Sequence, residues 1–261
     1  MTLIKNETKR KIKAGQLALG FGIQHLRTSA LGMIAAASDH DWLFIDMEHG
    51  AFSMQEATQI CIAALTTGVT PIVRVCADAL DEGTRALDNG ALGVVVPHVD
   101  TRAQAVRVAQ AFRYPPAGTR SWGGAPAVFH YQPPGHAEAQ ALLNDEVLVV
   151  AMIESREAVA NAEAIAGVPG IDALLIGTSD LSADLGIAGQ IGHAEVQAAY
   201  KAVEAACRKH GKVLGMGGVY DREWATRYVR DNGARLVLSG SDHAYFLAGA
   251  KQRTELLRSA V

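Results

Sequence analysis

The chain has 261 residues, of which 49% are hydrophobic and 20% are charged, and its formal net charge is -3. This length suits one closed α/β barrel, and the composition is that of a globular protein with a large core. The mild negative charge provides no basic face for a phosphate backbone, which argues against a nucleic-acid partner. We therefore expect one domain, residues 1–261, that acts on small molecules.

The N-terminal residues carry the main basic cluster, from Lys5 to Lys13, which we interpret as a solvated first helix. No continuous apolar h-region and no run of 18 apolar residues occurs, so neither a signal peptide nor a membrane partner is predicted. The cysteines Cys61, Cys76 and Cys207 have no metal-like spacing, and we expect all three to be buried apolar side chains. These features predict a cytoplasmic protein.

Eight short apolar runs are continuous rather than alternating, as is typical of strands that are covered on both faces. They span residues 17–23, 42–48, 71–75, 92–99, 147–154, 172–178, 212–218 and 234–240. Helices are predicted at residues 29–37, 54–66, 81–89, 102–112, 157–166, 194–210 and 221–231. Repeated strand-then-helix units predict a (β/α)8 barrel, with a doubly wound sheet as the competing topology.

One long segment, residues 113–140, interrupts this alternation and is rich in proline, glycine and aromatic residues. A segment of this kind in a compact domain is usually a lid, a binding loop or an oligomer contact. Its Arg113, Arg120 and Trp122 are expected either to cover the far end of a ligand or to pack against a second subunit.

Polar residues gather where the predicted strands end, which is the edge that carries the active site in barrels of this type. Unpaired charges at the end of a buried strand are costly, so packing alone does not explain them. In chain order they are Asp46, Glu48, His49, Arg74, His98, Asp100, Glu154, Thr178, Ser179, Asp180, Ser239, Ser241 and Asp242.

Glu154 and Asp180 follow two consecutive predicted strands, so their carboxylates are expected to share one face of the barrel. Two carboxylates, with the remaining positions left to water and substrate oxygens, suit Mg²⁺ or Mn²⁺ better than zinc. The alternative is that each is a helix N-cap or first-turn acid. That alternative fits Asp180 better than Glu154, which lies inside the end of an apolar strand.

His49 is a candidate general base, and Asp46 is expected to orient its imidazole by accepting the other ring N–H. Arg74 is a candidate electrophile, because its bidentate guanidinium can hold a carboxylate or a developing enolate oxygen. The alternatives are a surface turn histidine at position 49 and a structural ion pair of Arg74 with Asp46 or Glu48.

The positions of the lysines distinguish between two mechanisms. A Schiff-base aldolase requires a lysine at an inner strand end, but Lys212 opens the seventh strand at the opposite end and the others lie outside the strands. Enolate formation from a metal-chelated 2-oxo acid is therefore favoured. Glycine-containing turns at 215–218 and 239–241 leave a phosphorylated ligand open as a rival.

Six segments in this chain resemble a known family. They are IDMEHG at 45–50, VRV at 73–75, VVPHVDT at 95–101, RYPPAGTR at 113–120, IES at 153–155 and IGTSDLSADLG at 176–186. With order and spacing kept from about Gly20 to Asp242, the chain resembles the HpcH/HpaI aldolase family of metal-dependent 2-oxo-acid aldolases. The resemblance implies a (β/α)8 barrel and a homohexamer, a trimer of dimers that exchange the C-terminal helix.

The resemblance also implies a bound Mg²⁺, Mn²⁺ or Co²⁺ ion that is held by Glu154 and Asp180. It implies that Arg74 stabilises the pyruvate enolate and that His49 with Asp46 forms the acid/base dyad.

Two further sites are implied only by the resemblance. Asp88, in ALDNGALG, matches an aspartate that enters the active site of the neighbouring subunit. The backbone of Gly177, Thr178 and Ser179 would receive the substrate carboxylate at the start of a helix.

The chain departs from the family pattern at three places. Thr178 stands where many members have proline. Phe21 is nearest to a tryptophan of the first strand and is expected to contact the substrate. Residues 121–132 match no part of the pattern, and we expect them to select the acceptor aldehyde.

Our hypothesis is a class II aldolase that reversibly cleaves a 4-hydroxy-2-oxo acid. The products would be pyruvate, or a related 2-oxo acid such as hydroxypyruvate, and an aldehyde. The main alternative is a lyase or synthase of the same fold that acts on a phosphorylated or CoA-linked substrate. A third interpretation is a non-catalytic protein that binds metal or pyruvate without turnover.

Overall fold

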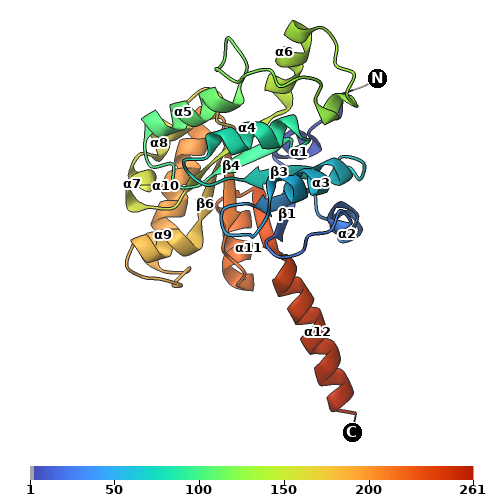
Figure 1. The fold of residues 1–261 in the computed structure, drawn as a ribbon. Coiled ribbons are helices and arrows are strands. Elements are labelled where there is room, and N and C mark those ends of the chain that lie inside the picture. The colour runs from blue at the N-terminus through green and yellow to red at the C-terminus, as the bar shows by residue number, and fades with distance from the viewer. Residues whose placement is uncertain (1–2, 261) are drawn as a thin grey trace.

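The computed structural model describes residues 3–260, which form a closed barrel of parallel strands that pair in chain order, with β8 returning to β1 (Figure 1). The strands are β1 (Ala18–Ile23), β2 (Trp42–Asp46), β3 (Thr70–Arg74), β4 (Gly93–Val96), β5 (Leu148–Ile153), β6 (Ala173–Gly177), β7 (Val213–Gly217) and β8 (Leu236–Ser241). Every predicted apolar run overlaps one of these strands. The (β/α)8 barrel is confirmed, and the doubly wound sheet is wrong.

Helices surround the barrel in the order expected for this fold (Figure 1). They are α1 (Glu7–Lys13), α2 (Leu31–Ala37), α3 (Met54–Ala64), α4 (Leu80–Asp88), α5 (Arg102–Phe112), α6 (His136–Glu146), α7 (Arg156–Ala160), α8 (Ala162–Ala166), α9 (Thr178–Asp184), α10 (Ala194–His210), α11 (Arg222–Arg230) and α12 (Asp242–Arg258). Local caps fix several starts, including the capping box of Ser53 and Glu56 at α3 and that of Thr101 and Gln104 at α5.

Two side-chain layers follow from the alternation along each strand. Trp42 and Phe44 of β2 point into the barrel, whereas Leu43 and Ile45 pack outward against the helices. Trp42 is fully buried against β1, where a Cβ atom on Gly20 would overlap its indole ring. Glycine at position 20 therefore provides the space that the largest side chain of the interior occupies.

The first helix differs from the prediction that it is solvated. Ile12 of α1 packs into the inner core, and the Lys9 side chain is only 6% exposed. The Lys9 ammonium donates to the carbonyl of Val147 at 2.6 Å and lies 3.2 Å from Asp172. The helix is amphipathic and closes the amino-terminal end of the barrel, so part of the basic cluster is structural.

Other predicted elements are corrected in detail. The helix expected at 157–166 is divided at Asn161 into α7 and α8. The segment 113–140, expected to be a loop, includes the 3₁₀ turn Ala127–Phe129 and the start of α6. The three cysteines are free, but Cys76 is exposed, and only Cys61 and Cys207 are buried as predicted.

The last helix, α12, extends away from the barrel instead of packing on it (Figure 1). Its apolar side chains Phe246, Leu247, Leu256 and Leu257 are exposed, Phe246 by 74%. Within residues 3–260, no helix is both long enough and apolar enough to cross a membrane.

Candidate active site

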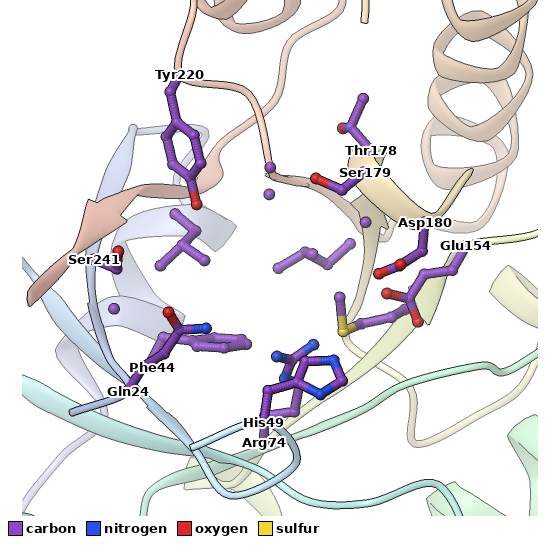
Figure 2. A pocket seen from close by; sticks show the side chains of 17 residues that line it. Gln24, Phe44, His49, Arg74, Glu154, Thr178, Ser179, Asp180, Tyr220 and Ser241 are labelled. Atoms are coloured by element: carbon purple, nitrogen blue, oxygen red, sulfur yellow. The ribbon is translucent and has the colours of Figure 1, made fainter. Parts of the chain in front are cut away.

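A cavity of about 270 Å³ opens at the carboxyl ends of the strands (Figure 2). Its floor is apolar and is formed by the inward-facing Phe44, Met152, Leu175 and Leu238. Above the floor, polar side chains from opposite walls converge. A small cavity of this kind, with an apolar floor and a few convergent polar groups, is typical of an active site.

The residues predicted from the strand ends meet at this cavity. His49, Arg74, Glu154 and Asp180 all line it, with the two carboxylates side by side near the guanidinium (Figure 2). No lysine is among the lining residues of the described chain, and Lys212 precedes β7 at the opposite end of the barrel, as predicted.

Glu154 directly follows β5 and is only 3% exposed. Its Oε2 atom accepts the backbone N–H of His98 at 2.9 Å, and a Cβ atom on Gly177 would overlap Oε1. Burial raises the pKa of Glu154, and the negative charge of Asp180 raises it further. A buried carboxylate beside a second carboxylate is an arrangement that a cation would stabilise.

The donor set fits a hard divalent cation. Within residues 3–260, no three side chains of the types His, Cys, Asp and Glu come together at metal-binding distances. The protein would therefore supply two carboxylate ligands, Glu154 and Asp180, and leave the other positions to water and substrate. This balance suits Mg²⁺ or Mn²⁺, which accept oxygen ligands and retain water.

Asp46, at the end of β2, forms a bidentate ion pair with Arg74. Its Oδ1 accepts from Nε of Arg74 at 3.0 Å and its Oδ2 from Nη2 at 2.6 Å, while Gln24 donates to Oδ2 at 3.0 Å. Burial raises the pKa of Asp46, but the hydrogen bonds and charge of Arg74 outweigh it and keep the pKa below its usual value. Asp46 is thus ionised and holds the guanidinium in place.

The predicted contact between Asp46 and the imidazole of His49 is not present, which is a correction. Asp46 instead accepts the backbone N–H of His49 at 3.1 Å, because its oxygens are already directed at Arg74 and Gln24. The imidazole is 61% exposed, and its Nε2 lies 3.7 Å from Glu48. His49 therefore faces the cavity from a turn whose backbone Asp46 fixes.

Arg74 is both structurally paired and available to a ligand. Besides Asp46, it contacts Glu48 at 3.0 Å, and its guanidinium lies over the Phe44 ring at 5.1 Å. Burial lowers the pKa of Arg74, but Asp46 and Glu48 raise it overall. The ion pair considered as an alternative is present, and Arg74 still lines the cavity with a permanent charge.

The sixth strand leads directly into α9, whose first turn borders the cavity. Gly177, Thr178 and Ser179 all line the cavity, as the resemblance implied. The Thr178 hydroxyl is hydrogen-bonded to the buried hydroxyl of Tyr200 at 2.8 Å. Threonine at this position therefore anchors the turn to α10 while its backbone borders the cavity.

The predicted substrate contact of Phe21 is corrected by the structure. Phe21 points out of the barrel and packs against His40 and Tyr245, with ring centroids 5.2 and 5.1 Å apart. Because side chains alternate along β1, Gly22 and then Gln24 reach the cavity instead. These two positions form the wall that had been assigned to Phe21.

Asp88 lies at the end of α4, outside the cavity of its own chain. Its carboxylate pairs with Arg120 at 2.7 Å and remains 27% exposed. A single chain does not test whether Asp88 reaches a neighbouring subunit, so that role stays a prediction.

The segment 113–140 does not cover the cavity within the chain. Arg113 is held by Asp172 at 2.5 Å, Arg120 by Asp88, and Trp122 lies near the rings of Tyr114 and His136. Residues 121–132 contribute nothing to the cavity wall, so selection of the aldehyde by this segment of the same chain is not supported. A contact with another subunit stays open.

Sequence reasoning missed Gln24 and Tyr220 at the site and gave His98, a strand-end residue, no role. Gln24 holds Asp46, Tyr220 overhangs the cavity (Figure 2), and His98 lies beside Glu154 with Nδ1 3.6 Å from Oε2. His98 adopts a left-handed backbone conformation, with φ of 52°, that directs its N–H at Glu154. Only His98 had a signal in the sequence, as a polar residue at a strand end.

Comparisons with known proteins identify the relatives of this chain. A family model described as HpcH/HpaI aldolase/citrate lyase matches residues 25–248. The chain is 36% identical to a 4-hydroxy-4-methyl-2-oxoglutarate aldolase of Hapsidospora irregularis, over 97% of this chain and 94% of that protein. It is 33% identical to a 2-keto-3-deoxy-L-rhamnonate aldolase of Shigella sonnei, over 98% and 95%. A crystal structure of an HpcH/HpaI aldolase from Desulfitobacterium hafniense superposes with a TM-score of 0.90 at 30% identity, covering 96% of each chain.

Proposed function

The chain belongs to the HpcH/HpaI aldolase/citrate lyase family, and from this premise we propose that it is a divalent-metal-dependent aldolase of 2-oxo acids. It would reversibly cleave a 4-hydroxy-2-oxo acid to an aldehyde and pyruvate, or a related 2-oxo acid such as hydroxypyruvate. The observation that carries the proposal is that Glu154 and Asp180 lie together beside Arg74 in one small cavity.

We assign Glu154 and Asp180 as the ligands of Mg²⁺, Mn²⁺ or Co²⁺. Such a cation, when bound, polarises the 2-oxo group and lowers the energy of the enolate. The backbone N–H groups from Gly177 to Ser179 would bind the substrate carboxylate.

The proton and charge transfers would be carried by side chains of the chain itself. Arg74, fixed by Asp46, would donate hydrogen bonds to the enolate oxygen as its negative charge develops. His49, through a water molecule, would take the proton from the 4-hydroxyl group during cleavage and return it during addition. Asp46 would serve His49 indirectly, by fixing the backbone of its turn.

We also propose a homohexamer built as a trimer of dimers that exchange α12. The exposed apolar side chains of α12 support this, because they have no partner among the described residues of one chain. In this assembly Asp88 would complete the active site of a neighbouring subunit. A reducing, cytoplasmic setting stays a prediction from the cysteines.

The alternative of a phosphorylated or CoA-linked substrate is less well supported by the geometry. Asp242 directly follows β8, and its Oδ2 accepts the backbone N–H groups of Gln24, His25 and Leu26 at 2.6 to 3.2 Å. These amides belong to the loop after β1, which lies beside the end of β8, and they are the type of donor that a phosphate would need there. The chain's own carboxylate already occupies them.

The proposal is tested by measuring pyruvate release from 4-hydroxy-2-oxo acids with and without EDTA. We expect EDTA to abolish the release and added Mg²⁺ or Mn²⁺ to restore it. Glu154→Ala and Asp180→Ala should remove activity, whereas Glu157→Ala, an exposed acid on α7, should not. Activity that persists in EDTA or in both ligand variants would contradict the metal mechanism. Pyruvate binding without turnover would instead indicate a non-catalytic protein.

A further inference from the structure

A second cavity, of about 360 Å³, lies at the amino-terminal ends of the strands, opposite the candidate active site. It is bordered by α1 and by the residues that lead into β5, β6 and β7. Three lysines line it: Lys9, Lys13 and Lys212. The proposed aldolase chemistry uses none of them.

The charges around this cavity do not balance. Asp172 is the acidic residue of the described lining, and it is shared by Arg113 at 2.5 Å and Lys9 at 3.2 Å. Lys212 donates to the carbonyl of Ile171 at 2.7 Å, and no carboxylate of residues 3–260 lies within ion-pair distance of it or of Lys13. Four cationic side chains therefore surround a single carboxylate.

The Lys9 ammonium group is buried and that of Lys212 is half-buried, which makes the imbalance costly. Burial lowers the pKa of Lys9 to about 8, with smaller lowering contributions from the positive charges of Arg113 and Lys13 and an opposing one from Asp172. Burial also lowers the pKa of Lys212, the charge of Asp172 partly opposes this, and the charges of Arg113 and Lys13 add to the lowering. Buried charges in folded proteins are normally paired. An anion in the cavity would offset both the burial and the mutual repulsion.

We propose that this cavity binds a phosphate group, carried either by inorganic phosphate or by a small phosphorylated metabolite. A dianion would offset most of the excess positive charge, and ammonium groups from α1 and from the loop before β7 approach the cavity from different sides. The apolar Ile12, Leu148 and Val213 close the remaining wall. The site is independent of the proposed aldolase reaction and of its metal.

Binding at this position should stabilise the barrel. A ligand that binds only the folded chain adds to its stability in proportion to the logarithm of ligand concentration over Kd. Asp172 and Lys212 immediately precede β6 and β7, the strands that end at Gly177 and Gly217 in the active-site cavity. The phosphate site would thus fix the start of two strands whose other ends border the active-site cavity.

The test measures binding by calorimetry, and thermal unfolding, of the full chain with inorganic phosphate and, separately, with glycerol phosphate. Sodium chloride at equal ionic strength is the reference. We expect Lys212→Met to weaken phosphate binding by about tenfold or more, because it removes one charge-assisted hydrogen bond. Lys13→Met should weaken it less. Lys201→Met, an exposed lysine on α10, should leave it unchanged.

Each outcome decides the proposal. No binding at millimolar phosphate, or equal affinity in wild type and Lys212→Met, would overturn it. Equal affinity in that variant would place the anion elsewhere, for example at Arg74 in the active site. Tighter binding of glycerol phosphate than of inorganic phosphate would identify a phosphorylated metabolite as the ligand. Lys9→Met is unsuitable as the main variant, since loss of its ion pair with Asp172 would also destabilise the fold.

Discussion

Arg74 carries two functions in one side chain, since it is the partner of buried Asp46 and the cationic group of the candidate site. Lysine at this position keeps the charge but not the two parallel hydrogen bonds to Asp46. We expect Arg74→Lys to lower kcat by roughly 10²- to 10³-fold, as loss of a transition-state donor typically does. Steady-state kinetics should show a smaller change in KM. A kcat within twofold of wild type would contradict the role, and exposed Arg208→Lys is the control.

Asp242, the first residue of α12, binds the loop that follows β1. Burial raises the pKa of Asp242, but backbone N–H groups of Leu26, His25, His243 and Gln24 outweigh it and lower the pKa overall. Its stabilising effect is therefore complete above the unfolded pKa, near about 4, and is lost as pH falls through the lower folded pKa.

This linkage gives a prediction for Asp242→Asn, which keeps the shape of the side chain but removes its charge. At pH 7 the variant should lose about 1 to 3 kcal/mol of unfolding free energy, the usual cost of charged hydrogen bonds. The difference from wild type should narrow as the pH falls below about 4. Urea unfolding at several pH values measures it. A difference that is constant with pH would show that the charge of Asp242 is not the cause.

For single residues, the sequence predicted the positions that depend only on nearby residues along the chain. Glu154 and Asp180 were expected to share a face because each follows a strand of the same parallel sheet, and they do. The contact of Asp242 with residues 24–26 joins positions more than two hundred apart, and no local pattern encodes it. The outward direction of Phe21 depends on the register of β1, which an apolar run leaves undefined.

The junction between β6 and α9 is the element that places the two proposed metal ligands side by side. Gly177 ends β6 where it passes the Glu154 carboxylate, and a Cβ atom there would overlap Oε1. We expect Gly177→Ala to displace Glu154 and weaken Mn²⁺ binding by roughly 10- to 100-fold, as changes in the support of a metal ligand do.

The matched control is Gly135→Ala, because no atom lies within 4 Å of a Cβ at that position and its φ is -55°. Mn²⁺ binding is measured by calorimetry or by the loss of the free-ion electron paramagnetic resonance signal, so catalytic activity is not needed. Unchanged Mn²⁺ affinity in Gly177→Ala would argue against Glu154 as a ligand.

Helices with a clear periodicity of apolar residues and clear capping residues were predicted correctly. Features that depend on packing against residues distant in the sequence were not. The bounds of α5 and α10 were predicted correctly because capping residues and an amphipathic pattern mark them. Helix α6 was missed because it begins directly after a run of proline and glycine. The burial of α1 was missed because Lys9 finds Asp172 only after the barrel closes.

On the scale of the whole molecule, the apolar side of α12 and part of Asp88 remain exposed among residues 3–260 of one chain. A closed barrel has no free strand edge, so helices and loops must provide any contact between subunits. Exchange of α12 between two copies would bury its exposed leucines and bring loops of one subunit near the site of the other. If Asp88 completes that site, neither subunit is active alone.

This arrangement predicts complementation between two inactive variants. His49→Ala and Asp88→Asn should each lose most activity, since each removes a different group from every shared site. The two variants are mixed by co-expression with two affinity tags. About half of random pairs within the hexamer contain one copy of each variant, and one of the two sites of such a pair is intact. About a quarter of wild-type activity should therefore be recovered. Kinetics of the doubly tagged fraction measures the recovery. Mixed assemblies that stay inactive would show that Asp88 does not act across the interface.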